Sequence, residues 1–161
     1  MSESRQGVLF EVNGVGSVSC GKRYWLTPPD LYAALDAEFG FDCDPCPFPL
    51  PEGFNGLELE WGGVNYVNPP FRPQHVIGGS GPTAFVTKAL EQQRLGKTSV
   101  LVLPVRWYTD MLFRAGAECR ALGRVRWREC GSGDPMPNPG PVALFVLRGH
   151  ATEGDSCCER S

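Results

Sequence analysis

The chain has 161 residues, of which 42% are hydrophobic, and this is enough to bury one apolar core without disulfide support. Its first residues lack the apolar stretch of a secretion signal, and no window approaches the length of a membrane-spanning helix. We therefore expect a globular cytoplasmic protein and no membrane partner. The seven cysteines are an odd number, which favours buried thiols over a framework of disulfides.

The formal net charge of −3 is unevenly distributed along the chain. Residues 1–87 carry four Lys or Arg and ten Asp or Glu, a balance of −6. Residues 88–128 carry nine basic and three acidic residues, a balance of +6. A basic segment of this kind is typical of a surface that contacts phosphates, but solvated helix faces with a charged hairpin would give the same pattern.

The first predicted helix covers residues 27–40. Thr27 is the expected N-cap, Pro28 the first helical residue, and Asp30 can complete a capping box. The glycine at the end of this segment is a typical C-terminal stop. A short strand is predicted next, over residues 41–46, and a loop rich in proline, glycine and acidic residues follows it.

The rest of the chain alternates between strand and helix patterns. The continuous apolar run over residues 99–104 predicts a strand that is buried on both faces of a sheet. The predicted elements are a strand over 64–67, helices over 83–95 and 107–115, the strand over 99–104, and strands over 123–128 and 142–148 that pair like a hairpin at the end of the sheet. Residues 1–20 form an N-terminal segment, 21–148 the domain, and 149–161 a tail that we expect to be disordered.

The tetrapeptide Asn68-Pro69-Pro70-Phe71 follows the predicted strand over residues 64–67. Proline cannot continue the strand, so Asn68 is expected at its end, where open α/β sheets place their active sites. The side-chain oxygen of Asn68 and the carbonyl of Pro69 are two acceptors that could hold an NH2 group, and Phe71 offers a flat face for a base. The tetrapeptide predicts a pocket for an aminopurine or aminopyrimidine; an ordinary strand-to-loop turn is the alternative interpretation.

Three landmarks resemble those of S-adenosylmethionine-dependent amino-methyltransferases, most closely the small phage-type Dam-like DNA N6-adenine methyltransferases. The segment from Trp25 to Pro28 is similar to the opening W-x-T-P element, residues 39–46 to the first strand with an acidic residue at its tip, and residues 68–71 to the catalytic motif. The resemblance covers about residues 24–148. It implies an α/β fold, namely an abbreviated Rossmann-like methyltransferase sheet with flanking helices and a C-terminal hairpin-like strand pair.

The resemblance also implies the roles of individual residues. Asn68, Pro69, Pro70 and Phe71 fall on the target base, whereas the residues that fall on the S-adenosylmethionine cofactor are Trp25, Thr27, Pro28, Asp44 and Pro45. A glycine-rich loop usually follows the first strand in this family, but prolines follow Asp44 here. The acidic residue that holds the cofactor ribose is not identifiable, with Glu58 and Glu60 as candidates.

The predicted partner is DNA, and a target adenine would have to be flipped out of the duplex. Arg124, Arg126 and Arg128 alternate along a predicted strand, so they should project from one face and contact phosphates. Methyl transfer from a sulfonium needs no metal, and the two histidines stand in no metal-like setting. The recognition sequence and the oligomeric state cannot be predicted from the sequence.

Other interpretations of these motifs stay open. Cys43-x-x-Cys46 could belong to a zinc site or a redox dithiol, but it has no second ligand pair at matching spacing and does not begin a helix. A methyltransferase that acts on cytosine N4, an RNA base or a protein glutamine could use the same Asn-Pro-Pro-aromatic pocket. A degenerate methyltransferase fold that only binds nucleic acid is the alternative outside enzymes.

Overall fold

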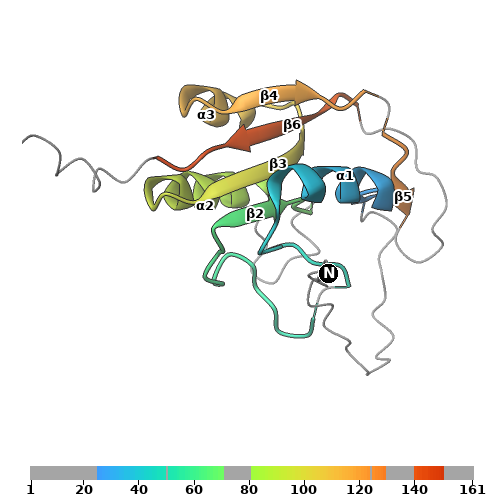
Figure 1. Ribbon diagram of the computed structural model, residues 1–161, viewed down its shortest axis with the longest axis horizontal. Coiled ribbons are helices and arrows are strands. Elements are labelled where there is room, and N and C mark those ends of the chain that lie inside the picture. Colours follow the sequence, from blue (N-terminus) through green and yellow to red (C-terminus); the bar gives the residue numbers. More distant parts are fainter. Residues whose placement is uncertain (1–24, 50, 71–80, 124, 130–139, 151–161) are drawn as a thin grey trace, which may run out of the picture.

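The computed structural model of the protein describes residues 25–49, 51–70, 81–123, 125–129 and 140–150. These residues form a mixed α/β fold in which helices pack against a four-stranded sheet (Figure 1). The helices are α1 (Pro29–Phe39), α2 (Pro82–Arg94) and α3 (Thr109–Arg114). The strands are β1 (Trp25–Leu26), β2 (Val64–Val67), β3 (Thr98–Pro104), β4 (Glu118–Ala121), β5 (Arg128–Glu129) and β6 (Val142–Leu147).

The four-stranded sheet has the strand order β2-β3-β6-β4. Strands β2 and β3 are parallel and are connected through α2, so they form a β-α-β unit. Strand β6 lies between β3 and β4 and is antiparallel to both. A separate antiparallel pair joins β1 to β5, with Leu26 opposite Arg128.

The core consists of one apolar layer on each face of the sheet. Alternate side chains of β3 enter the two layers: Val100 and Val102 pack on the side of α1, and Leu101 and Leu103 on the side of α2 and α3. Every residue of β6 is buried. Burial on both faces explains why these two central strands are continuous apolar runs in the sequence.

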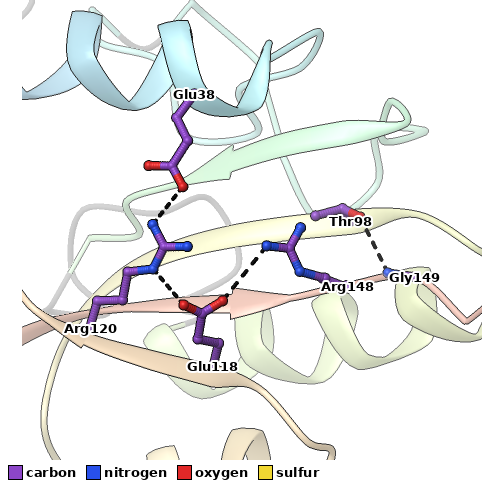
Figure 2. Close-up of polar contacts among 6 residues, drawn as sticks. All are labelled: Glu38, Thr98, Glu118, Arg120, Arg148 and Gly149. Carbon is purple, nitrogen blue, oxygen red and sulfur yellow. Dashed lines mark hydrogen bonds and ion pairs between the residues drawn. The ribbon is translucent and has the colours of Figure 1, made fainter.

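Ion pairs connect α1 to the edge of the sheet (Figure 2). The guanidinium of Arg120 in β4 donates to Glu38 of α1 at 2.6 Å and to Glu118 at 2.7 Å. Arg148, just after β6, lies 3.7 Å from the other oxygen of Glu118. The two arginines hold the pKa of the Glu118 carboxyl below its usual range, with the hydrogen bond from Arg120 as the largest cause. The network links α1 to β4 at the surface of the molecule.

Most of the predicted elements are confirmed within one or two residues. The helix predicted over residues 27–40 is α1, and it ends at Gly40, which has a left-handed φ of 66° and donates to Asp36 O at 2.8 Å. The strand over residues 64–67, the helix over 83–95 and the strand over 99–104 are β2, α2 and β3. The helix predicted over 107–115 is the shorter α3.

The predicted strand over residues 41–46 is reduced to a single parallel bridge between Cys43 and Asn65. Backbone hydrogen bonds from Asp42 N to Val64 O and from Tyr66 N to Cys43 O flank this bridge, at 3.0 and 2.9 Å. The segment therefore lies beside β2, at the free edge of the sheet. Its proline at position 45 ends the pairing, as expected for a residue that cannot donate to a ladder.

Three predictions about the elements are wrong. Thr27 is not the N-cap of α1: that position belongs to Pro28, without a side-chain capping bond, because the Thr27 hydroxyl bonds to residues distant in the sequence. Among the described residues of the strand predicted over 123–128, only Arg128 belongs to a strand, as the first residue of β5. The expected hairpin partner of β6 is also incorrect, because β6 pairs with β3 and with β4, a strand that the sequence pattern did not indicate.

The loop before β2 depends on the absence of a side chain at Gly56. A Cβ there would lie 1.7 Å from the carbonyl oxygen of Pro45, so the two backbone segments touch directly. The Gly56 carbonyl accepts a hydrogen bond from the indole nitrogen of Trp61 at 2.8 Å, and Trp61 is almost fully buried. Gly56 thus attaches this loop both to residues 44–46 and to the core.

We expect Gly56→Ala to lower the free energy of unfolding by about 1–3 kcal/mol, since the added methyl group forces apart two backbone segments that cannot both relax. Chemical denaturation measures this change. Gly81→Ala is the matched control: it has a negative φ and open space around its Cβ, so its effect should be smaller. Equal effects of the two substitutions would contradict the close approach of Gly56 to Pro45.

Candidate functional site

Asn68 lies directly after β2, at the end of the sheet where the parallel strands β2 and β3 have their carboxyl ends. This is the place predicted from the sequence, and it is where open α/β sheets bind ligands. Pro69 and Pro70 follow and are buried, so the backbone after Asn68 is held in place. Phe71, the fourth residue of the motif, lies outside the described residues.

The side-chain amide of Asn68 has a defined orientation. Its nitrogen donates to the carbonyl oxygen of Trp25 at 3.0 Å and to the Thr27 hydroxyl at 3.2 Å. Because a backbone carbonyl can only accept, the NH2 group and not the oxygen must face Trp25. The Asn68 side-chain oxygen accepts no hydrogen bond within the described part of the chain, and it is left as a free acceptor.

The hydroxyl of Thr27 joins Asn68 to Tyr66. The Thr27 and Tyr66 hydroxyls form a hydrogen bond in which either group can be the donor. Tyr66 is almost fully buried, and burial is the largest cause that raises the pKa of its phenol. Its hydroxyl therefore stays protonated. Thr27 therefore lies beside Asn68 and its hydroxyl orients the Asn68 amide, while its predicted contact with the cofactor stays a prediction.

Tyr66 is a site residue that the sequence interpretation missed. Residues i and i+2 of a strand project from the same face, so a tyrosine two positions before Asn68 could have been identified from spacing alone. Its ring packs edge-on against Tyr32 of α1, with ring centroids 4.9 Å apart, and tilted against Phe41 at 5.2 Å. These aromatic contacts hold the Tyr66 hydroxyl beneath α1.

Asp44 belongs to the same cluster. Its carboxylate accepts a hydrogen bond from the backbone N–H of Cys46 at 2.8 Å, and its charge contributes to raising the pKa of both Tyr66 and Tyr32. Burial raises the pKa of Asp44 itself to about 6, and the bond from Cys46 only partly opposes this shift. No ion pair to Asp44 occurs in the described ranges. A carboxylate in this setting would be stabilised by a cationic ligand.

The other predicted cofactor residues take backbone and packing positions. Pro28 is buried and its carbonyl accepts from Tyr32 N at 3.0 Å, at the start of α1. Pro45 is buried against Gly56. The candidates for the ribose are both engaged elsewhere: Glu58 accepts from the Asn55 side chain at 2.9 Å, and Glu60 lies 3.9 Å from Lys97.

Two of the three predicted DNA-binding arginines can be placed, because Arg124 lies outside the described residues. Arg126 and Arg128 are exposed and flank the buried Trp127, as expected for side chains that alternate in direction. Arg128 is paired with Leu26 through β5 and β1, next to Thr27. The structure therefore brings this part of the basic segment to the end of the sheet that carries Asn68.

Cys43 and Cys46 are free thiols. Burial raises the pKa of both, and the charge of Asp44 raises it further, so their thiolate forms are disfavoured. Thiolates are the forms that bind metals and attack disulfides. Among the described residues, no group of acidic, cysteine or histidine side chains could hold a metal ion, and no helix is long and apolar enough to cross a membrane.

The raised pKa of Asp44 predicts a dependence of stability on pH. Because the folded protein binds this proton more tightly than the unfolded chain, with pKa values of about 6 and 3.8, Asp44 stabilises the fold below pH 3.8 and loses this contribution as the pH rises through 6. Asp44→Asn keeps an acceptor for Cys46 and removes the titration. We expect the unfolding free energy of the wild type, relative to this variant, to fall by roughly 2–3 kcal/mol across this range.

Chemical denaturation of both proteins at a series of pH values measures this difference. Other carboxyl groups titrate alike in the two proteins and cancel. A difference that stays constant between pH 4 and pH 7 would mean that Asp44 ionises as readily as a carboxyl group in water, and that the cluster around it is open to solvent.

The geometry of Asn68, Thr27, Tyr66 and Asp44 has to be interpreted by its chemistry alone. Comparison of this chain with protein-family models, with curated proteins and with solved structures finds no match.

Proposed function

We propose that this protein is a DNA methyltransferase that transfers a methyl group from S-adenosylmethionine to the N6 amino group of adenine. The orientation of the Asn68 amide is the observation that carries the proposal. Both of its N–H bonds are used by Trp25 and Thr27, so its oxygen is available to accept from an incoming NH2 group. An asparagine needed only for a turn would not require this two-point attachment to a segment forty residues away.

The proposed role of the site is to position and polarise an amine. The lone pair of the adenine amino nitrogen is delocalised into the ring, which makes it a weak nucleophile. Hydrogen bonds from its two protons to the Asn68 side chain and to the Pro69 carbonyl would favour a pyramidal nitrogen and direct its lone pair. The contacts of Asn68 fix one acceptor before the substrate arrives, and the buried prolines stiffen the other.

Asp44 fits the proposed cofactor. S-adenosylmethionine supplies an electrophilic methyl group on a positively charged sulfonium. Burial raises the pKa of the half-buried Asp44 carboxyl, and no ion pair in the described part of the protein opposes this shift. A cationic ligand beside it would stabilise its ionised form. Pro45 follows Asp44 directly, and Thr27 is linked to the same cluster through Tyr66.

The arrangement of elements is compatible with an abbreviated Rossmann-like methyltransferase sheet. Strands β2 and β3 form a parallel β-α-β unit with helices on both faces of the sheet, and the site lies at the carboxyl ends of these strands. The exposed Arg126 and Arg128 at this end support DNA as the substrate, because a flipped base requires contacts that hold the phosphate backbone.

We expect Asn68→Ala to lower the turnover number for DNA methylation on the order of 10²–10³-fold, as for the loss of one preorganised hydrogen-bonding group. Transfer of a labelled methyl group to an adenine-containing duplex measures this loss, and calorimetry measures cofactor affinity, which should change little. Near-native turnover of Asn68→Ala would contradict the assigned chemistry.

Thr27→Val provides an intermediate variant for the same assay. It leaves Asn68 in place but removes one of the two acceptors that orient its amide, so turnover should fall by less than in Asn68→Ala. Absence of cofactor binding at millimolar concentration to the wild-type protein would exclude the enzymatic proposal. Parallel assays on RNA and on protein distinguish a DNA substrate from these alternatives, and a duplex without adenine distinguishes adenine N6 from cytosine N4.

The two placed arginines give an independent test of the DNA substrate. Phosphate contacts release counterions, so log affinity should fall with log salt concentration by about 0.9 per contact on duplex DNA. The double substitution Arg126→Gln and Arg128→Gln should weaken DNA binding and flatten this dependence by up to about two contacts, without a change in cofactor affinity. An unchanged slope would mean that both arginines belong to a solvated face.

A further inference from the structure

The turn that follows β3 presents an exposed tryptophan beside an arginine. Trp107 is 72% exposed, more than any other large apolar side chain among the described residues, and Val105 beside it is 46% exposed. Single exposed apolar residues are common on protein surfaces and need no explanation by themselves. The surroundings of Trp107 therefore decide whether its exposure has a function.

The backbone of this turn, residues 105–108, is held firmly. The Arg106 carbonyl accepts from both the N–H and the hydroxyl of Thr109, at 2.9 and 2.6 Å. Val105 N donates to Pro141 O at 2.9 Å, and this bond connects the turn to the start of β6. The buried ring of Tyr108 contacts Trp107 edge-on, with centroids 5.9 Å apart. Trp107 is thus exposed on a fixed support.

The free charge of the turn is positive. Arg106 is exposed and forms no ion pair within the described ranges, whereas the nearby Asp110 is paired with Arg114 at 2.6 Å. The charge of Arg106 also reaches the Tyr108 phenol, where it opposes the burial that raises this pKa to about 12. An unpaired guanidinium next to an exposed indole suits a ligand that offers both a phosphate and a flat ring.

The turn lies at the same end of the strands as Asn68. In the parallel pair of β2 and β3, Val67 is opposite Leu101, so Asn68 extends one residue beyond that level and Val105 extends four. At about 3.3 Å per residue, the turn lies roughly 10 Å further along the strand direction. This separation is comparable to the reach of one or two nucleotides from a base held at Asn68.

We propose that Trp107 and Arg106 form a second nucleic-acid contact, in which the indole stacks on a base that flanks the target and the guanidinium binds a phosphate of the same strand. This inference rests on the proposed function for the position of the target base, but it concerns different residues. A protein partner is less well suited, because the patch is small and has a charged residue between its two apolar side chains.

Fluorescence anisotropy of a short fluorescein-labelled DNA duplex, and of one of its separated strands, tests this contact with the full chain. Trp107→Ala should weaken binding about 5- to 150-fold, which corresponds to the stacking of one base. Arg106→Gln should weaken binding and reduce the salt slope by about one contact. The matched controls are Leu95→Ala and Arg94→Gln. Both residues lie at the end of α2, near the opposite end of the strands, and the Leu95 side chain is 64% exposed.

Weaker binding by both turn variants with unchanged binding by both controls supports the inference. Equal affinity of Trp107→Ala and the wild type, or no DNA binding by the wild type, overturns it. If the wild type transfers methyl groups to DNA and Trp107→Ala does not change DNA affinity, this inference is overturned and the proposed function stays intact. DNA binding that depends on Trp107, without any affinity for S-adenosylmethionine, would overturn the proposed function alone.

Discussion

Burial of β3 and β6 on both faces is the constraint on which the rest of the fold depends. These two strands share six residue pairs, from Ser99 opposite Leu147 to Pro104 opposite Val142, and almost every side chain in them is buried. A sheet whose centre is apolar on both faces must be covered on both, so α1 lies on one side and α2 with α3 on the other. Strand β2 is thereby left at one side of the sheet, and its carboxyl end is free to carry Asn68.

The attachment of residues 25–27 to that end is what distinguishes the site from an ordinary turn. Trp25 and Thr27 are distant from Asn68 in the sequence and lie just before α1, so their hydrogen bonds to Asn68 require α1 to be packed on the sheet. Tyr66 connects this polar cluster to the aromatic layer under α1. Packing energy from the core therefore fixes a polar geometry at its margin, which is the condition for a preorganised site.

Sequence patterns correctly predicted those helices and strands whose residue pattern does not depend on which element they pack or pair with. The apolar run over residues 99–104 and the helix that ends at Gly40 depend on burial and on local backbone rules, and both are found in the structure. Strand β4 was missed because its residues are largely exposed and show no apolar alternation. The strand predicted over 123–128 failed for the opposite reason: its regular alternation does not reveal that the available partner, β1, is only two residues long.

The strand-end position of Asn68 is confirmed, whereas the capping role predicted for Thr27 is wrong because its hydroxyl has distant partners. Asn68 was expected at the end of a strand and lies there, since proline ends a strand wherever it occurs. The residues that follow Thr27 predict that its hydroxyl caps α1. In the structure this hydroxyl bonds to Tyr66 and Asn68 instead of to the first backbone N–H groups of the helix. No local pattern contains these contacts.

The basic segment also becomes interpretable once its ion pairs are known. Several of its charges are engaged in the described structure, since Lys97 faces Glu60, Arg114 pairs with Asp110, and Arg120 bridges two glutamates. These residues behave as a solvated, internally neutralised surface. The basic residues that are exposed and have no ion pair in the described ranges are Arg94, at the end of α2, and Arg106, Arg126 and Arg128. Arg128 is joined through β1 to the segment that holds Asn68, and Arg106 follows the strand beside it, so these two charges, unlike that of Arg94, lie at the end of the sheet that carries Asn68. This is the end at which we propose that DNA binds.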